Sequence, residues 1–406
     1  MKNCSQSFLF TTKLSQIIRN GSTITITVYQ DRLSLSGLKK SSGCEKFDKD
    51  IDFQTTHYVL NWDYSIHSKV IEGFSLCKQN KRRYIFSGSS DQLSQLKNIL
   101  GGLMAFSDWE KDFKFVKHIR NNQKCQIILA KHENQYQVLK LIDFLCPNNS
   151  NNYTIQTSEE LRALKLIQKN PHNNIHGFNS YYIDEMKCFL VMDYLSQGTL
   201  YDLQKKYNYK IPINIIQEVM QQILEGLNHL HQLKIIHRDI KYDNIMVASF
   251  NPIQIKIIDL GLCVIDNSSN SRAGTGGYIA PEVFQSTKIT DKIDIFSAGA
   301  VFHKLLVGKP IYDDLVQNQN GNIRINSHIQ NQNALDLLHQ MLNFDPKLRY
   351  SAYDCLAHPF FTDESDSLSS KTSLYQYLSP KQVKLQVFTP ATDFITNQNI
   401  HPFKLN

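Results

Sequence analysis

The feature that most constrains this chain is a polar run that directly follows the mostly apolar segment Leu233–Ile236. It reads His237-Arg238-Asp239-Ile-Lys-Tyr-Asp-Asn244. Further along the chain come Asp-Leu-Gly at 259–261 and Ala-Pro-Glu at 280–282. Each of these short motifs is weak when taken alone. Their order and spacing together carry the information.

In this order and spacing the motifs resemble the catalytic loop, the metal-binding loop and the end of the activation segment of eukaryotic protein kinases. The resemblance implies an α+β, two-lobed fold over residues 113–361, with a β-rich small lobe and a helical large lobe. It also implies ATP and Mg²⁺ as cofactors and transfer of the γ-phosphate of ATP to Ser or Thr of protein substrates. Lys241 favours Ser and Thr, because tyrosine kinases lack a lysine at this position.

The resemblance assigns catalytic roles to Asp239, Lys241 and Asn244. Asp239 would accept the proton of the substrate hydroxyl, and Lys241 would steady the transferring phosphate. Asn244 and Asp259 match the two metal ligands of the family. Oxygen donors of this kind suit a hard cation that keeps several waters.

The predicted nucleotide-binding residues lie mostly upstream of these motifs. Lys140 matches the lysine that holds the α- and β-phosphates. Glu160 is its predicted ion-pair partner, because helical spacing places it on the apolar face of residues 159–167; Glu159 is the alternative. The other predicted cofactor-binding residues, with Met192 as gatekeeper and Asp193–Leu195 as hinge, are Ile119, Ile127, Val138, Met192, Asp193, Leu195 and Met246.

The loop expected to cover the phosphates has lost its glycines, which are replaced by Arg120, Asn122 and Cys125. Glycine lets a backbone approach phosphates closely, so this loss is expected to loosen the clamp. Either Arg120 and Lys124 supply cationic contacts instead, or the segment is an ordinary charged hairpin. Two functions follow: an active serine/threonine kinase, or a catalytically weak or inactive pseudokinase that serves as a scaffold.

The segment before Ala-Pro-Glu carries the candidate control residues. Thr275 matches the threonine that bonds the catalytic Asp and Lys in serine/threonine kinases. Ser271 lies at about the activating phosphorylation site of the family, with Ser268 and Ser269 as alternatives. These serines are either phosphorylation sites or plain loop residues.

Four further residues match structural positions of the family. Asp294 and Gly299 resemble the large-lobe anchor that ties down the catalytic loop. Glu282 and Arg349 match a buried ion pair under the activation segment.

Residues 1–108 are expected to form a small β-rich domain that resembles a pleckstrin-homology domain in architecture. Thr23–Tyr29 alternates β-branched residues, and Phe74–Cys77 with Tyr84–Phe86 predicts a hairpin. A helix should follow, capped by Ser89 or Ser90. That family usually carries a Trp in the closing helix, where this chain has Leu96.

The turn of this predicted hairpin is basic, with Lys78, Lys81, Arg82 and Arg83. It is either a surface for an anionic membrane or a phosphoinositide, or a solvated hairpin tip. Membrane association through the N-terminal domain is therefore one possible partner interaction besides protein substrates.

Composition narrows the class of protein further. The net charge of +7 is mild, so no nucleic-acid partner is expected. The eight cysteines are scattered without a Cys-x-x-Cys pair, which favours a reducing, cytoplasmic compartment. The apolar patch Phe8–Phe10 is too short for a signal peptide or a membrane span. Residues 362–406 are expected to be a polar tail.

Overall fold

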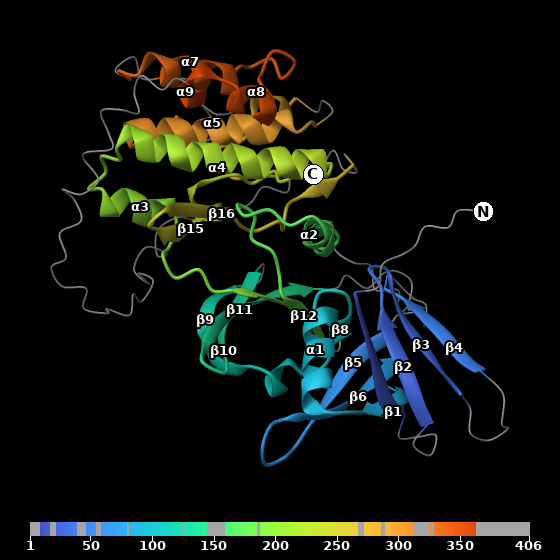
Figure 1. Cartoon of the computed structure of the whole chain (residues 1–406). Helices are drawn as coiled ribbons and strands as arrows, with labels where there is room; N and C mark the ends of the chain where they lie inside the picture. The colour runs from blue at the N-terminus through green and yellow to red at the C-terminus, as the bar shows by residue number, and fades with distance from the viewer. Residues whose placement is uncertain are drawn as a thin grey trace, which may run out of the picture. The chain divides into compact units, whose positions relative to one another are not determined.

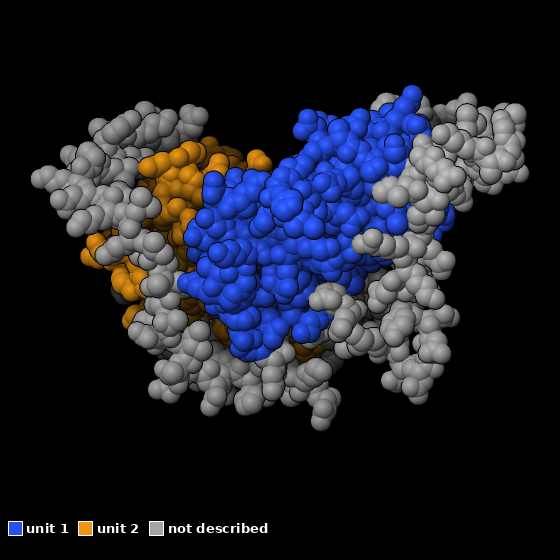
Figure 2. Space-filling view, turned by 90° about the horizontal axis from the view of Figure 1, so that it is seen from below, with its two compact units in different colours: residues 1–169, 177–194 blue, residues 170–176, 195–406 orange. Residues whose placement is uncertain are grey.

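The computed structural model describes residues 9–16, 22–38, 46–53, 58–78, 81–122, 125–143, 159–184, 187–266, 272–285, 289–311, 325 and 329–362. Ser268, Ser269, Ser271, Lys124 and residues 363–406 of the predicted tail lie outside them. The chain divides into two compact units, drawn in different colours in Figure 2. The first is Met1–Lys169 with Gly177–Tyr194, and the second is Asn170–His176 with Leu195–Asn406.

The first unit begins with seven described strands and a helix. They are β1 (Phe10–Gln16), β2 (Ser22–Val28), β3 (Arg32–Leu38), β4 (Lys46–Asp52), β5 (Tyr58–Tyr64), β6 (Ile71–Lys78), β7 (Lys81–Ser87) and α1 (Ser90–Leu100). Neighbouring strands of this group pair antiparallel in the order β4-β3-β2-β1-β7-β6-β5.

Alternation along the strands explains why this region folds as a sheet. Ile24, Ile26 and Val28 of β2 are buried, whereas Thr25 and Thr27 point to the other face, as the two-residue period of a strand requires. The prediction of a β-rich N-terminal region with a β6–β7 hairpin is confirmed. The pleckstrin-like assignment stays a prediction. The side chains of the basic turn lie outside what the structure describes.

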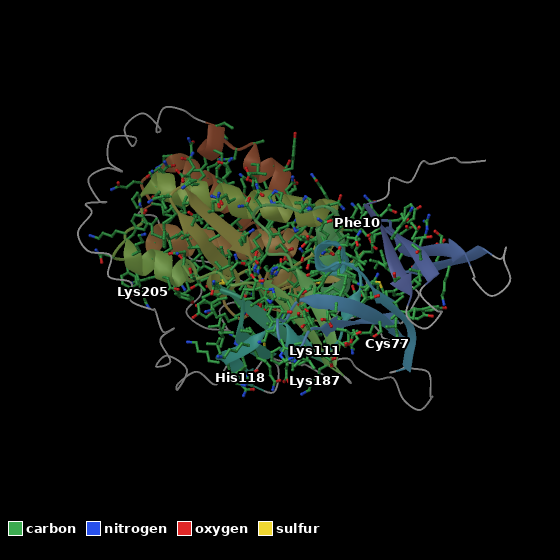
Figure 3. The ribbon with its side chains drawn as sticks, turned by 60° about the horizontal axis from the view of Figure 1, so that its bottom comes forward. Phe10, Cys77, Lys111, His118, Lys187 and Lys205 are labelled. Atoms are coloured by element: carbon green, nitrogen blue, oxygen red, sulfur yellow. The ribbon has the colours of Figure 1, made fainter. Side chains whose placement is uncertain are left out.

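The small-lobe part of the first unit contains strands around one helix. Its elements are β8 (Ala105–Phe106), β9 (Lys114–Asn122), β10 (Cys125–His132), β11 (Gln135–Asp143), α2 (Glu159–Lys169), β12 (Ser180–Asp184) and β13 (Lys187–Asp193), with a 3₁₀ turn at Trp109–Lys111. Strand β9, where Figure 3 labels His118, ends the described sheet and is exposed along its whole length. Its lysines and arginine suit a sheet edge, because charge there discourages pairing with other chains.

Strand pairing is continuous across the predicted domain boundary at residues 108–113. Within the described part of the chain, β8 pairs in parallel with β5 on one side and with β12 on the other. All thirteen strands from β1 to β13 therefore belong to one sheet. The boundary itself stays a prediction.

The second unit is mainly helical. Its described helices are α3 (Leu200–Lys206), α4 (Ile213–Gln232), α5 (Lys292–Val307), α7 (Gln332–Met341), α8 (Ala352–Leu356) and α9 (Pro359–Thr362), with strands β14 (Ile235–Ile236), β15 (Ile245–Phe250), β16 (Ile253–Ile257) and β17 (Val264–Ile265) and 3₁₀ turns at Tyr242–Asn244 and Pro281–Val283. Figure 1 shows α4 and α5 side by side along this unit.

The two long helices form its core for reasons visible in the sequence. The face of α4 that repeats at helical spacing, from Ile216 to Leu230, is buried, which confirms the predicted core helix. Helix α5 is buried on nearly all sides, as expected for a helix that is apolar all round. It ends at Gly308, whose φ of 80° is the left-handed conformation that glycine adopts at low cost.

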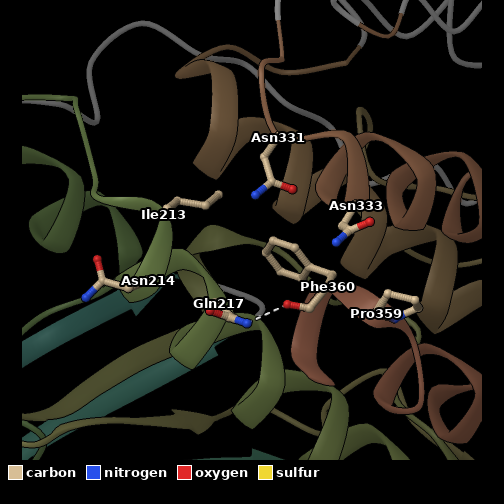
Figure 4. A pocket seen from close by; sticks show the side chains of 7 residues that line it. All are labelled: Ile213, Asn214, Gln217, Asn331, Asn333, Pro359 and Phe360. Atoms are coloured by element: carbon tan, nitrogen blue, oxygen red, sulfur yellow. Dashed lines mark hydrogen bonds between the residues drawn. The ribbon is translucent and has the colours of Figure 1, made fainter. Parts of the chain in front are cut away.

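A small hollow lies at the N-terminal ends of α4 and α7 (Figure 4). Its lining residues are Ile213, Asn214, Gln217, Asn331, Asn333, Pro359 and Phe360. None of them is a predicted site residue. Among the residues that the structure describes, no helix has both the length and the apolar character needed to cross a bilayer.

Candidate active site

The centre of the candidate site is a hydrogen-bonded cluster around the carboxylate of Asp239. Lys241 Nζ donates to Asp239 Oδ2 at 2.8 Å, and Thr275 Oγ1 donates to Asp239 Oδ1 at 2.6 Å. Lys241 Nζ also donates to Thr275 Oγ1 at 2.7 Å. Asn244 Nδ2 bonds both the backbone carbonyl and Oδ2 of Asp239, at 2.8 and 2.9 Å. The structure thus brings together all three predicted catalytic residues and the predicted activation-segment threonine.

The loop that carries Asp239 is held in a strained conformation. Arg238 has a φ of 66°, which costs a residue with a Cβ roughly 1–2 kcal/mol. Asp294 offsets this cost, because its carboxylate accepts the backbone N–H groups of His237 and Arg238, both at 2.8 Å. The predicted role of Asp294 as an anchor therefore has a direct geometric basis.

Asp294 is fully buried and still ionised. Burial raises its pKa, but the hydrogen bond with His231 and the electrostatic interactions with His231 and His237 outweigh burial and bring the pKa of Asp294 below its ordinary value. His231 Nε2 lies 2.9 Å from Asp294 Oδ2.

The two predicted metal ligands stand near this loop with oxygen atoms suited to a cation. The amide nitrogen of Asn244 is committed to Asp239, which turns the amide oxygen away from that residue. Asp259 adopts a φ of 64°, and its Oδ1 accepts the backbone N–H of Gly261 at 3.2 Å. No three His, Cys, Asp or Glu side chains in the described ranges form a metal-binding group. Mg²⁺ is commonly held by one or two protein ligands together with substrate phosphates.

The predicted buried ion pair is present under the activation segment. Arg349 Nη1 and Nη2 donate to the two carboxylate oxygens of Glu282 at 2.6 and 3.0 Å. The guanidinium also bonds the carbonyls of Asn343 and Lys292, both at 2.8 Å. Such a bidentate pair holds the Pro281–Val283 turn against the start of α5.

In the first unit, strand register places four predicted cofactor-binding residues on one face of the sheet. Lys140 lies opposite Ile127 of β10, and Val138 lies opposite Met192 of β13. Residues two apart on a strand share a face, and so do directly opposed residues. All four are half-buried. This face therefore offers an apolar surface with one cation at its side.

The predicted partner of Lys140 is confirmed as Glu160. Lys140 Nζ lies 2.6 Å from Glu160 Oε1, and the two side chains are 12% and 8% exposed. Glu159, the alternative, instead pairs with Arg162 on the exposed side of α2. The apolar spacing of α2 determines which glutamate faces the sheet, because Glu160 lies on the buried side of the helix with Leu164 and Ile167.

The segment that replaces the glycine-rich loop consists of the antiparallel strands β9 and β10, whose pairing has two register shifts. The pairing of β9 with β10 extends to Asn122 opposite Cys125, and Cys125 N–H donates to Asn122 Oδ1 at 2.8 Å. Ile119 sits at a register shift and is 38% exposed. The charged-hairpin interpretation therefore describes the backbone, while a contact with phosphates stays a prediction.

The remaining predicted residues lie in or shortly after strands. Asp193 ends β13 and accepts the amide of Asn179 at 2.8 Å. Leu195 and Met246 are half-buried residues of the second unit. Met246 of β15 lies opposite Lys256 of β16. No sequence pattern points to Asn179, because its partner lies fourteen positions away at the end of β13.

Comparison with known proteins agrees with this geometry. A family model described as the protein kinase domain matches residues 113–361. Because this is more than half of the 406 residues, the chain belongs to the protein kinase family. The α+β, two-lobed fold is the fold of that family, and the family uses ATP and a divalent metal.

Several curated proteins are similar to part of the chain. It is 33% identical over 233 residues to the serine/threonine-protein kinase pakA of Talaromyces marneffei, covering 52% of this chain and 34% of that protein. It is 33% identical over 232 residues to the serine/threonine-protein kinase ste20 of Aspergillus fumigatus, covering 52% and 27%. The Aurora kinase of Saccharomyces cerevisiae is 32% identical over 200 residues, covering 47% and 53%. The chain thus spans between about a quarter and a half of the length of these relatives.

Proposed function

We propose that this chain is a serine/threonine protein kinase that transfers the γ-phosphate of ATP to Ser or Thr of protein substrates. The observation that carries the proposal is the cluster of Asp239, Lys241, Asn244 and Thr275. It combines a carboxylate that can accept a hydroxyl proton with a cation beside the same carboxylate. The similar fungal kinases named serine/threonine-protein kinases support the same substrate class.

Each residue has a role that follows from its chemistry. Asp239 orients the substrate hydroxyl and accepts its proton as the oxygen attacks phosphorus. Lys241 neutralises charge on the transferring phosphate, and Thr275 fixes the positions of both groups. Phosphoryl transfer needs chiefly positioning and charge neutralisation of this kind.

We propose that the nucleotide is bound by the cofactor-binding residues around Lys140 and, through a metal ion, by Asn244 and Asp259. Lys140, held by Glu160, binds phosphate oxygens, while the half-buried face with Ile127, Val138 and Met192 covers the adenine ring. Asn244 and Asp259 would hold Mg²⁺ through their oxygens. When bound, the metal neutralises phosphate charge.

Phosphate transfer in the presence of Mg²⁺ and radiolabelled ATP tests this function. Wild-type protein should label itself or a generic basic protein, and Asp239→Asn should abolish the label because the proton acceptor is lost. If folded wild-type protein labels nothing beyond the mutant, also after Ser271→Glu, the chain is a pseudokinase scaffold instead. The hairpin at 119–127, which lacks the glycines, is the feature that favours that second function.

We also propose that the basic turn with Lys81, Arg82 and Arg83 meets an anionic membrane or a phosphoinositide. The proposal rests on four cations within six residues, each worth about 1 kcal/mol at such a surface. Binding to phosphatidylserine vesicles should fall after the triple change to Ala, and unchanged binding would exclude this surface.

A cytoplasmic location is proposed from the cysteines. Of those that the structure describes, Cys77, Cys125, Cys188, Cys263 and Cys355 are free thiols. Free thiols are typical of a reducing compartment.

A further inference from the structure

The N-terminal β region and the small lobe share one hydrophobic core. The cluster runs from Ile26 and Trp62 in the N-terminal strands to Tyr182 and Val191 in the small lobe. Phe106 of β8 lies at the junction, with ring centroids 5.7 Å from Trp62 and 5.5 Å from Tyr182. A core that spans both parts means that neither part buries its apolar surface alone.

A buried carboxylate in the connecting segment joins three elements. Asp112, whose side chain is 5% exposed, pairs with Lys97 of α1 at 2.5 Å. It accepts the hydroxyl of Tyr64 of β5 and, on the other side, the hydroxyl of Tyr182 of β12 at 2.5 Å. One carboxylate thus holds two N-terminal elements and one small-lobe strand.

The charged groups of this network are buried, so their interactions are screened little by water. Burial lowers the pKa of Lys97, and the negative charge of Asp112 opposes that shift. Lys97 Nζ also lies 5.7 Å from the ring centroids of Trp62 and Phe106. Loss of either charged partner would leave the other one buried without its counter-charge, which is strongly destabilising.

A second contact leads from α1 toward the nucleotide-binding strand β13. Gly101 ends α1 with a helical backbone, and a Cβ placed there would lie 2.9 Å from the carbonyl oxygen of Asn179. Asn179 is itself bonded to β13, through its N–H to Val191 and through its amide to Asp193, both at 2.8 Å. Residues of the N-terminal region therefore rest on the loop that supports the predicted hinge.

We infer that the N-terminal β region is a fixed part of the small lobe, in which Asp112 and Gly101 are positioning residues for the nucleotide-binding face. Asp112 locks the region to β12, and Gly101 allows α1 to approach Asn179 closely. Nucleotide affinity then depends on residues that contact no nucleotide. The affinity part of this inference rests on the proposed binding of ATP.

The first arm of the test is amide hydrogen exchange of the full chain, wild type beside Asp112→Asn. Exchange in α1, β12 and β13 should accelerate together, by at least about 100-fold, because the charged partner of Lys97 is lost and the shared unit opens as one. The control is Lys111→Ala at the position directly before Asp112, which removes an exposed ion pair with Asp108. Lys111 is labelled in Figure 3. This control should leave all three elements unchanged.

Faster exchange confined to the N-terminal strands and α1 would overturn the inference, since the region would then be an independent module. If Asp112→Asn does not fold, Tyr182→Phe takes its place. That change removes only the hydroxyl on the small-lobe side and keeps the ring packing.

The second arm is the affinity for ADP with Mg²⁺ by isothermal titration, comparing Gly101→Ala with Gly177→Ala. Gly101 lies next to Asn179 in space, and Gly177 lies two positions before it in the sequence. A Cβ at Gly177 would meet nothing within 4 Å. Gly101→Ala should weaken ADP binding by about fivefold or more, and Gly177→Ala by less than twofold. Equal affinities for the two variants would overturn the positioning role.

The arms separate this inference from the proposed function. Wild-type protein that binds ADP but transfers no phosphate refutes the kinase activity and leaves both arms intact. If wild-type protein binds no ADP, the exchange comparison alone decides whether the region is part of the small lobe.

Discussion

Removal of Arg349 should destabilise the large lobe far more than removal of a surface arginine. The side chains of Arg349 and Glu282 are 0% and 5% exposed, and the guanidinium also lies 5.0 Å from the ring centroid of Phe296. Arg349→Met keeps much of the apolar stem but takes away the whole fork of donors. Glu282 then stays buried without the guanidinium that neutralises it.

The expected magnitude follows from this burial. Breaking a buried pair by removal of one partner costs about 3–5 kcal/mol, because the remaining charge is uncompensated. With a urea dependence of about 2–3 kcal/mol/M, this lowers the unfolding midpoint by about 1–2.5 M. The control is Arg162→Met in the first unit, read by fluorescence, which removes an exposed partner of Glu159, with side chains 51% and 37% exposed. That loss should cost less than about 1 kcal/mol.

The two units can be followed separately in one titration. The chain has two tryptophans, and both Trp62 and Trp109 lie in the first unit, so fluorescence reports that unit. Circular dichroism at 222 nm reports chiefly the long helices α4 and α5 of the second. Arg349→Met should shift the dichroism transition and leave the fluorescence transition nearly in place.

A double-mutant cycle supplies the outcome that would refute the reasoning. Adding Glu282→Gln to Arg349→Met removes the uncompensated charge, so the double variant should be more stable than the sum of the two single losses predicts. Additive losses, or a single loss for Arg349→Met as small as that for Arg162→Met, would show that the pair contributes little despite its burial.

Three other predictions test the site itself. Lys140→Met removes the cation paired with Glu160 and should lower ADP affinity by about tenfold or more in isothermal titration; an unchanged affinity would remove Lys140 from the nucleotide site. Thr275→Val deletes the hydroxyl that bonds both Asp239 and Lys241. Steady-state assays should therefore show a kcat lower by about tenfold or more, with the KM for ATP changed by less than about twofold. A change in KM alone would contradict this role. The pKa of Asp294 lies below its ordinary value in the folded chain, so its stabilising effect is present above pH about 3.9 and is lost as pH falls through the folded pKa. Urea midpoints measured from pH 6 to 3 should therefore depend less on pH in Asp294→Asn, whereas parallel curves would argue against the shift.

The sequence alone determined what depends on local order. Motif order and spacing, through their resemblance to protein kinases, predicted that Lys241, Asn244 and Thr275 act with Asp239, and the structure brings these four residues together. Helical spacing in α2 selected Glu160 over Glu159, and strand alternation located β2 and the β6–β7 hairpin. The choice of Glu160 and the placement of the strands use the periods of 3.6 and 2 residues, which a sequence displays directly.

Only the tertiary structure decided how distant segments meet. Asp112 lies between the expected regions 1–108 and 113–361, yet it is the buried carboxylate on which Tyr64, Lys97 and Tyr182 converge. No local sequence pattern predicts such a residue, because its partners are far apart along the chain and come from three different elements. The same holds for β8, which pairs with β5 and β12 at once. Long-range pairing of this kind depends on the packing of the whole unit, and a periodic pattern along one segment contains no information about it.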